Sequence, residues 1–366
     1  MRVLICANND IGLYRFRKEL IQELLKSNEV YISLPYGDLV EPLKEMGCIY
    51  VETDIDRRGL DPLKDIRLFF RYMKMFRELR PDMVITYTIK PNVYAGIAAK
   101  IMHIRYFMNI TGLGTAFEKS GMLRKIAVGM YRMASAGAEK IFFENSTNRD
   151  VFLDEKICCV NQVCLLNGAG VNLGDFSFKE YPTSDKTVFL FVGRVMKEKG
   201  IDEFLYAAGK LHSENANTEF VIVGFMEDDY ESTIKDAENE GYVKYLGYQQ
   251  DMNKLYTDAS CIVLPSYHEG MSNVILEAAA SGRPVITSNI SGCREAVDDG
   301  VSGFLCEAGN CEDLYLKIKK FAELPDESKA AMGAAGHRKT AAMFDKRDVV
   351  KKTVSVIKER LQEKKI

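Results

Sequence analysis

The sequence lacks several features that would assign it to common functional classes. It contains no apolar stretch of about 18 residues, so no membrane-spanning helix is predicted, and the apolar run after Met1 is too short for a signal peptide. Its nine cysteines form no C-x-x-C pairing, which favours reduced core cysteines in a cytosolic protein. The 49 Lys and Arg nearly balance the 52 Asp and Glu, and a net charge of −3 does not indicate nucleic-acid binding. We expect a cytoplasmic protein that is soluble or peripheral to a membrane.

Two ligand-binding fingerprints are also absent. The segment after the first strand, Asn8 to Gly12, has a single glycine, whereas a dinucleotide fingerprint needs three, so a cofactor-binding dehydrogenase is not supported. His268 and Glu269 begin an H-E-x-x-H pattern, but residue 272 is serine, so no zinc pair forms. We expect no cofactor and no metal ion.

Short apolar runs alternate with amphipathic helical patterns along the whole chain. In the first half the runs are VLICA, VYISL, IYVE, MVITY, RYFMNI, KIFFEN and VCLL, with helices predicted near residues 13–26, 63–80, 91–102 and 120–135. A second series begins at Thr187. This alternation predicts parallel βαβ units, and therefore an α/β protein with doubly wound, Rossmann-like sheets.

The length of 366 residues suits two such domains. A polar stretch from Asn172 to Lys186, which contains Gly174 and Pro182, is predicted to be the linker. We predict an N-terminal domain of residues 1–175, a C-terminal domain of residues 176–345, and a charged C-terminal helix within residues 346–366.

The segment PSYHEGMSNVILEAAASGRP, residues 265–284, places two carboxylates around the start of a helix. Cys261 to Leu264 predicts a buried parallel strand, and Met271 to Ser281 has helical composition. Glu269 then lies in the loop after the strand and Glu277 lies inside the helix. At a rise of about 1.5 Å per residue they could stand up to roughly 12 Å apart, about the span from the ribose to the hexose of a nucleotide-sugar.

The backbone N–H groups between these two carboxylates would face an anion. They belong to Gly270, Met271, Ser272 and Asn273. In the alternative interpretation Glu269 is a solvated loop residue and Glu277 a surface helix residue. The run VILEAAASG argues against it, because that composition buries most faces of the helix and a buried carboxylate needs a partner.

A second constellation lies about 75 residues upstream. The run TVFLFV, from Thr187 to Val192, predicts a buried strand that leads into Gly193 and Arg194, and Lys199 precedes a helix that continues to about residue 212. Two cations and the positive end of a helix suit a diphosphate. Arg and Lys are common in exposed loops, but the carboxyl edge of a parallel strand is where open α/β sheets bind ligands.

Together, GRVMKEKG, YLGYQQDMNKLYTDASCIVLPSYHEGMSNVILEAAASGRPVI and EAVDDGVSGFL resemble the donor domain of retaining glycosyltransferase family 4, which has the two-domain GT-B fold. The resemblance covers residues 185–345. It implies that Arg194 and Lys199, beside Gly193, bind the donor diphosphate, that Glu277 binds the ribose and that Glu269 contacts the transferred sugar. It also implies metal-independent transfer with retention, and a C-terminal helix that packs back on the first domain.

The motifs TYTIKPNVYAG (86–96) and NITGLGTAFEKSG (109–121) resemble bacterial surface-polysaccharide members of the family, including those that extend undecaprenyl-diphosphate-linked sugars. Many members place a histidine near this strand end to contact the donor sugar, whereas this chain has Thr88 and Ile89 before Lys90, so that contact stays unassigned. The residues implied on the acceptor side are Lys90, Asn92, Thr111 and Gly112. The resemblance places Gly12 at the cleft, near the donor phosphates or the acceptor; a tight strand-to-helix turn is the alternative.

The first half of the chain is locally basic. Residues 57–140 contain 16 Lys and Arg against 6 Asp and Glu, a local charge of +10. Two cationic amphipathic helices are predicted there, and they could lie on an anionic membrane surface; an ordinary half-buried helix with a solvated basic face is the alternative. Their cations are Arg67, Arg71, Lys74, Arg77 and Arg80 in one helix, and Arg124, Lys125 and Arg132 in the other.

These observations predict a metal-independent retaining glycosyltransferase. We expect a UDP-sugar as donor, and as acceptor a polyprenol-diphosphate-linked or growing surface glycan at the inner face of the cytoplasmic membrane. A nucleotide-sugar epimerase of GT-B shape and a non-catalytic sugar-nucleotide-binding subunit of a polysaccharide assembly are the two alternatives.

Overall fold

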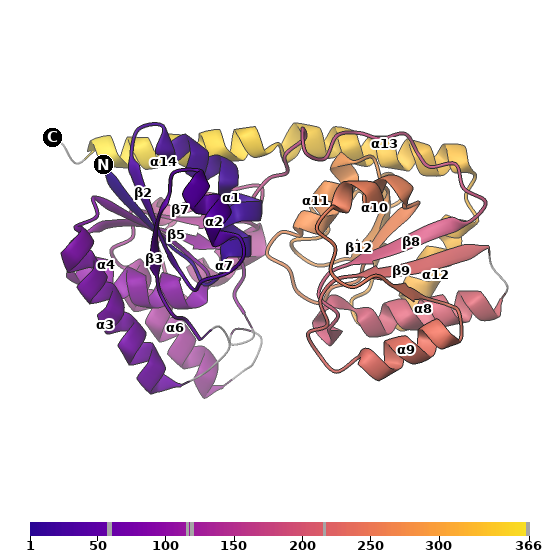
Figure 1. Ribbon diagram of the computed structural model, residues 1–366, viewed down its shortest axis with the longest axis horizontal. Helices are drawn as coiled ribbons and strands as arrows, with labels where there is room; N and C mark the ends of the chain where they lie inside the picture. The colour runs from indigo at the N-terminus through magenta and orange to yellow at the C-terminus, as the bar shows by residue number, and fades with distance from the viewer. Residues whose placement is uncertain (57–60, 115–116, 118–120, 215–216, 364–366) are drawn as a thin grey trace. The chain divides into compact units, whose positions relative to one another are not determined.

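The computed structural model of the chain describes residues 1–56, 61–114, 117, 121–214 and 217–363. The chain forms two compact units (Figure 1). The first unit comprises Met1–Ala169 and Arg347–Ile366, and the second comprises Gly170–Lys346. The chain thus enters the second unit at residue 170, where the sequence predicted 176, and its last helix belongs to the first unit.

The first unit contains a parallel sheet of seven strands. Each of the apolar runs identified in the sequence forms one strand, because parallel strands are covered on both faces and are apolar throughout. The strand order is β3-β2-β1-β4-β5-β6-β7. The strands are β1 (Arg2–Cys6), β2 (Glu29–Leu34), β3 (Ile49–Glu52), β4 (Met83–Tyr87), β5 (Arg105–Ile110), β6 (Lys140–Phe143) and β7 (Val163–Leu165).

Helices cover both faces of this sheet. Successive strand residues point to opposite faces, so Leu4 and Cys6 enter one core and Val3 and Ile5 the other. The first core is closed by α3 (Pro62–Leu79), the π-helical turn η1 (Pro91–Ala95), α4 (Gly96–Ile101), α6 (Met122–Ser135) and α7 (Ser146–Asp154). The second is closed by α1 (Asp10–Leu25), α2 (Val40–Glu45) and α14 (Lys346–Glu363). The short helix η2 (Val160–Gln162) precedes β7.

The C-terminal helix α14 is held on the first unit by polar contacts as well as apolar ones. The Arg105 guanidinium donates to the carbonyl of Leu361 at 3.0 Å and to that of Arg360. These are among the last carbonyls of α14, which have no partner inside the helix. Nearer its start, the Lys352 ammonium donates to the Leu165 carbonyl at 2.8 Å.

The second unit contains a parallel sheet of six strands in the order β10-β9-β8-β11-β12-β13. Its strands are β8 (Thr187–Val192), β9 (Thr218–Val223), β10 (Lys244–Tyr245), β11 (Cys261–Leu264), β12 (Val285–Ser288) and β13 (Gly303–Cys306). Its helices are η3 (Lys197–Lys199), α8 (Ile201–Ser213), α9 (Glu231–Asn239), α10 (Met252–Asp258), α11 (Asn273–Ala280), α12 (Cys311–Ala322) and α13 (Asp326–Met343). The predicted architecture of two Rossmann-like parallel sheets is confirmed.

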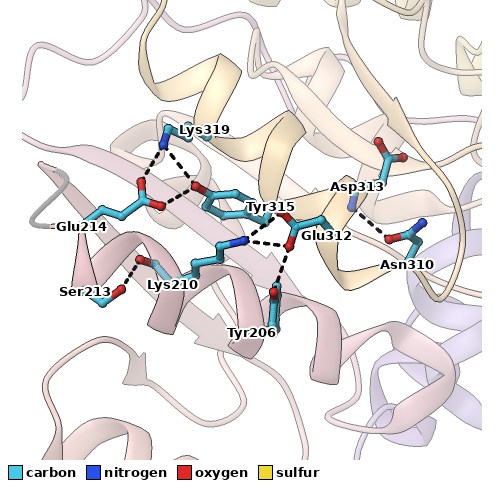
Figure 2. Close-up of polar contacts among 9 residues, drawn as sticks. All are labelled: Tyr206, Lys210, Ser213, Glu214, Asn310, Glu312, Asp313, Tyr315 and Lys319. Atoms are coloured by element: carbon cyan, nitrogen blue, oxygen red, sulfur yellow. Dashed lines mark hydrogen bonds and ion pairs between the residues drawn. The ribbon is translucent and has the colours of Figure 1, made fainter.

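Helices α8 and α12 pack against each other and are joined by a network of charges and rings (Figure 2). The Lys210 ammonium lies between the two oxygens of the Glu312 carboxylate, 2.8 Å from each, and 4.0 Å from the centre of the Tyr315 ring. One turn further along, Lys319 and the Tyr315 hydroxyl both bind Glu214. The network holds α8, whose first turn follows η3, against α12.

Each sheet reverses its strand order at one point. In the first unit the chain runs outward from β1 to β3 and then resumes at β4, on the other side of β1; in the second it runs from β8 to β10 and resumes at β11. The carboxyl ends of β1 and β4, and those of β8 and β11, therefore flank the position where open α/β sheets bind ligands. No helix in the described part of the chain is both long and apolar enough to cross a membrane.

Candidate active site

The strand-order reversal of the second unit brings together the loops after β8 and β11. Gly200, just after η3, has a φ of +77°, and a Cβ there would lie 2.3 Å from the Pro265 carbonyl oxygen. Glycine is thus needed at this position for both its conformation and its close approach. The Tyr267 N–H donates to the Glu198 carbonyl at 2.9 Å. The two loops are joined backbone to backbone, and this contact places Lys199 beside residue 269.

Lys199 and Glu269 form an ion pair across these loops. Lys199 Nζ lies 2.6 Å from Glu269 Oε1, and 17% and 13% of the two side chains are exposed. The Ser266 hydroxyl donates to the same carboxylate oxygen at 2.9 Å. The sequence predicted separate contacts of Lys199 with a diphosphate and of Glu269 with a sugar. The structure shows that the two groups also pair with each other.

Arg194 lies two residues beyond the end of β8, directly after Gly193. Its side chain is 46% exposed, and its guanidinium lies 3.8 Å from the Glu227 carboxylate. At that distance and exposure the pair contributes little stability, so the guanidinium is available to a ligand. The backbone beneath it is fixed, because the Gly193 N–H donates to the Val223 carbonyl at 3.0 Å.

The loop before α11 differs from the prediction at one backbone group. The Ser272 N–H donates to the Gly292 carbonyl at 2.9 Å, so it cannot face an anion as expected. This pairing also delays the start of the helix to Asn273, where the sequence predicted Met271. Gly270, Met271 and Asn273 lie in this same segment, at the carboxyl end of β11.

Glu277 lies inside α11, as its position in the sequence predicted, and it is half-buried. Its carboxylate accepts a hydrogen bond from the Tyr256 hydroxyl at 3.0 Å. Tyr256, on α10, is completely buried. Both carboxylates of the E-x7-E pattern are therefore held by neighbours rather than extended into solvent.

A pair of aromatic residues near these groups was missed in the sequence. Phe225 and Tyr248 follow β9 and β10 and stack with a centroid separation of 4.1 Å and an interplanar angle of 12°. They are nevertheless 49% and 39% exposed. In the sequence each stands directly after a glycine that follows a strand, and only the parallel order of β9 and β10 makes them neighbours. An exposed ring pair at a carboxyl edge offers a flat apolar surface to a nucleobase.

In the first unit, the predicted acceptor residue Lys90 lies just beyond β4, beside α3. Lys90 Nζ lies 2.7 Å from Asp65 Oδ1, and 14% and 17% of the two side chains are exposed. The Tyr94 hydroxyl donates to the other oxygen of Asp65 at 2.8 Å. Burial, then this hydrogen bond and the charge of Asp65, raise the pKa of the Tyr94 hydroxyl. Lys90 is thus a largely covered cation that is paired with the Asp65 carboxylate.

Asn92, which the sequence placed on the acceptor side, is instead buried beneath it. Its side chain is 1% exposed, accepts from the Thr86 hydroxyl at 2.6 Å and donates to the Asn109 carbonyl at 2.9 Å. These bonds fix the turn after β4, where Thr88 has the positive φ of 68° that β-branched residues rarely adopt. Asn92 therefore shapes the segment that carries Lys90, because its amide is used inside the core.

The remaining predicted positions are Thr111 and Gly112 on the acceptor side, and Gly12, which was predicted to lie near the donor phosphates or the acceptor. Gly12 is the third residue of α1, and its N–H donates to the Asn9 side chain at 2.6 Å, which is a helix cap. That N–H is therefore not available to a phosphate. Thr111 and Gly112 follow β5 and are half-buried. Residues 115–116 and 118–120 of the same motif, and Arg57 and Arg58 of the basic region, lie outside the described residues.

The predicted site residues thus form two groups, one per unit, each at a point of strand-order reversal. The donor group is Gly193, Arg194, Lys199, Glu269 and the start of α11 with Glu277; the acceptor group centres on Lys90. Within the described ranges, no three His, Cys, Asp or Glu side chains are grouped as metal ligands would be.

Two family matches cover most of the chain. Residues 2–145 match the family described as Glycosyl transferase 4-like, and residues 175–339 match Glycosyl transferases group 1. Solved structures with the same fold include that of Anabaena HepE in complex with UDP and glucose, with a TM-score of 0.81 and 16% identity over 98% of this chain and 100% of that one.

Two curated relatives are similar over much of their length. The N,N'-diacetylbacillosaminyl-diphospho-undecaprenol alpha-1,3-N-acetylgalactosaminyltransferase of Campylobacter jejuni is 28% identical over 88% of this chain and 90% of its own. The UDP-Gal:alpha-D-GlcNAc-diphosphoundecaprenol alpha-1,3-galactosyltransferase of Escherichia coli is 27% identical over 70% of each chain.

Proposed function

The chain belongs to the glycosyl transferases, with a 4-like first half and a group 1 second half, and from this we propose that it moves a hexose-type sugar from a UDP-sugar to a glycan carried on a polyprenol diphosphate. The observation that carries the proposal is the Lys199–Glu269 pair beside Arg194, where the sheet of the second unit reverses its strand order. Both curated relatives are named for acceptors on a diphospho-undecaprenol, which supports the same acceptor class here.

On this proposal, donor binding exchanges the partners of Lys199 and Glu269. The diphosphate takes the Lys199 ammonium, and hydroxyls of the transferred sugar donate to the Glu269 carboxylate. Lys199 exchanges a carboxylate for a phosphate, and Glu269 exchanges an ammonium group for sugar hydroxyls. Neither charged group is therefore left buried and unpaired. The 2.6 Å pair already orders both side chains at the site, which lowers the entropic cost of ordering them around the donor.

The chemistry requires stabilisation of a departing diphosphate. As the bond between the anomeric carbon and the phosphate oxygen breaks, negative charge grows on that oxygen, and Lys199 and Arg194 stabilise it. The acceptor hydroxyl attacks from the face that the diphosphate leaves, and its proton passes to the diphosphate, so the anomeric configuration is retained. We assign no protein nucleophile. The two cations supply the stabilisation, and transfer proceeds without added metal.

The nucleoside end of the donor meets different residues. The Glu277 carboxylate accepts hydrogen bonds from the ribose hydroxyls, and the Tyr256 hydroxyl orients this carboxylate. Phe225 and Tyr248 provide the surface on which the uracil stacks, and stacking of a base on an aromatic side chain contributes about 1–3 kcal/mol. This assignment gives a role to an aromatic pair that is stacked and yet 49% and 39% exposed.

The first unit supplies the acceptor side and the membrane contact. Lys90 would bind a phosphate of the lipid carrier in exchange for Asp65. Helices α3 and α6, which both pack against η1, expose an unusual set of apolar side chains beside their cations. The exposed residues are Leu63, Ile66 and Phe70 on α3, and Met122, Leu123, Ile126 and Met133 on α6.

Apolar residues flanked by cations suit an anionic leaflet. Within the described part of the chain, none of Arg67, Arg71 and Arg77 forms an ion pair, so their charges face solvent. We therefore propose a peripheral position on the inner face of the cytoplasmic membrane, with α3 and α6 against the lipid.

Release of UDP tests the proposal and separates it from its alternatives. The protein is incubated with a panel of UDP-hexoses and UDP-N-acetylhexosamines, with and without a polyprenyl-diphosphate-linked sugar. Release of UDP only when the lipid-linked sugar is present supports transfer. Consumption of donor without acceptor indicates an epimerase, and binding of UDP-sugar without any turnover indicates a binding subunit; either result contradicts the proposal.

A further inference from the structure

The turn at residues 290–293 lies directly behind the loop that carries Glu269. Gly292 has a φ of +87°, and a Cβ there would lie 2.6 Å from the Gly270 carbonyl oxygen and 2.8 Å from that of Glu269. Both obstacles are backbone atoms, so neither can rotate away as a side chain would. The Gly292 carbonyl in turn accepts the Ser272 N–H at 2.9 Å. The two segments are therefore in backbone contact along residues 269–272.

The turn is held by the carboxylate of Glu295. Glu295 accepts the Gly292 N–H at 2.7 Å with one oxygen and the Ser291 hydroxyl at 3.0 Å with the other. Each oxygen thus holds a different residue of the turn. Glu295 opens the EAVDDGVSGFL motif, and none of the roles assigned above uses it.

The turn also contains a buried thiol that is close enough to Glu269 to be affected by its charge. Cys293 is completely buried, and burial, together with the nearby charge of Glu269, raises the pKa of its thiol. The Glu269 carboxylate is thus held by Ser266 and Lys199, while the 290–293 turn contacts the backbone of its loop.

We propose that Glu295 is a positioning residue for the sugar donor, acting through Gly292 on the loop of residues 269–272 without touching the donor itself. The proposal rests on the function proposed above, because it assigns the loop to the donor sugar. A loop fixed before binding loses less conformational freedom when the donor binds. The contacts of Glu295 with the turn therefore affect donor affinity more than the chemical step. The proposal also assigns the Ser272 N–H to a hydrogen bond with the turn, so the diphosphate is bound by Arg194 and Lys199 and not by this N–H.

The test compares three variants with a neighbouring control. Glu295→Ala removes both hydrogen bonds, Glu295→Gln keeps one acceptor oxygen, and Gly292→Ala drives a Cβ into two carbonyls. Arg294→Ala alters an exposed side chain of the same turn and serves as the control. Donor KM, kcat, the melting temperature and amide hydrogen exchange of residues 269–277 in the unliganded protein are measured for each.

We expect Glu295→Ala to raise the donor KM about tenfold, with kcat changed by less than about threefold, since the two lost charge-assisted bonds act on the donor only indirectly, through the loop. Glu295→Gln should give a smaller rise, Gly292→Ala a larger one and Arg294→Ala none, and exchange at residues 269–277 should speed up in the same order. If Glu295→Ala does not fold, Glu295→Gln decides. Unchanged KM and exchange in Glu295→Gln, or a fall in melting temperature and kcat with donor KM unaltered, would overturn the proposal.

The exchange measurement needs no donor. Together with the donor KM of the wild-type protein, it therefore distinguishes failure of the positioning role of Glu295 from failure of the proposed glycosyl transfer. If the wild-type protein binds no UDP-sugar, the proposed function fails, and with it the positioning role, whatever the exchange shows. If the wild-type transfers sugar while the Glu295 variants keep its exchange pattern and donor KM, only the positioning role fails.

Discussion

Substituting Lys199 by methionine should affect stability and activity by different amounts that can be measured separately. Methionine keeps most of the side-chain volume but leaves the Glu269 carboxylate without its cation. Breaking a fully buried pair costs about 3–5 kcal/mol. Because 17% and 13% of these side chains are exposed and Ser266 still donates to the carboxylate, we expect about 1–3 kcal/mol.

The loss of activity should be larger. If Lys199 stabilises the departing diphosphate, its removal costs one preorganised charged donor, which is worth about 10²–10³ in kcat. The double variant Lys199→Met/Glu269→Gln separates the two effects. Removing the stranded carboxylate charge should recover about 1–2 kcal/mol of stability through the coupling of the pair, while activity stays lost.

Thermal unfolding and steady-state UDP release measure the two quantities on the same samples. Lys197→Met is the matched control, since Lys197 is an exposed lysine of the same short helix and its side chain forms no ion pair within the described residues. It should change neither quantity. If Lys199→Met is as active as Lys197→Met, or if the double variant regains activity together with stability, then Lys199 has only a structural role and the reasoning is refuted.

Four further predictions follow from the assignments above. Glu277→Ala should chiefly raise the dissociation constant for UDP-sugar and Arg194→Ala should chiefly lower kcat, as shown by calorimetry and initial rates; equal effects of both variants on both quantities would remove these assignments. Activity should persist in EDTA, and a strict need for added divalent metal would contradict the mechanism. Co-sedimentation with anionic phosphatidylglycerol vesicles should fall when Arg67, Arg71, Lys74 and Arg77 are changed to glutamine, but not when the exposed second-unit residues Lys235, Lys244 and Lys254 are; equal binding by both sets would place the membrane contact elsewhere. Tyr248→Ala should weaken UDP binding by roughly tenfold, the equivalent of about 1.4 kcal/mol of lost stacking, measured by calorimetry with Tyr242→Ala as control; unchanged affinity would remove the base platform.

The strands and the two-sheet architecture were predictable because a parallel strand covered on both faces is apolar along its length. The run Met83–Tyr87, for example, is buried at every position. Helix ends were less predictable. Helix α1 begins at Asp10 rather than near residue 13 because the Asn9 side chain caps it. The π-helical turn η1 has the same composition as an ordinary helix, so its hydrogen-bond pattern cannot be read from the sequence.

The parts of the site that depend on a local sequence pattern were predictable. The parts that depend on contacts between distant segments were not. Glu277 within a helix follows from the pattern around it, whereas the pairing of Lys90 with Asp65 joins residues 25 positions apart on different elements. The Ser272–Gly292 hydrogen bond is of the same kind. A peptide N–H at a helix start looks available in a sequence; whether another segment has already occupied it is decided only by the fold.

A crystal structure with a bound UDP-sugar would test the central claim most directly. We predict the diphosphate at the carboxyl ends of β8 and β11, with Lys199 Nζ moved from Glu269 to a phosphate oxygen and the Glu269 carboxylate within hydrogen-bond distance of the sugar. A nucleotide bound elsewhere on the chain, with the 2.6 Å pair between Lys199 and Glu269 intact, would contradict it.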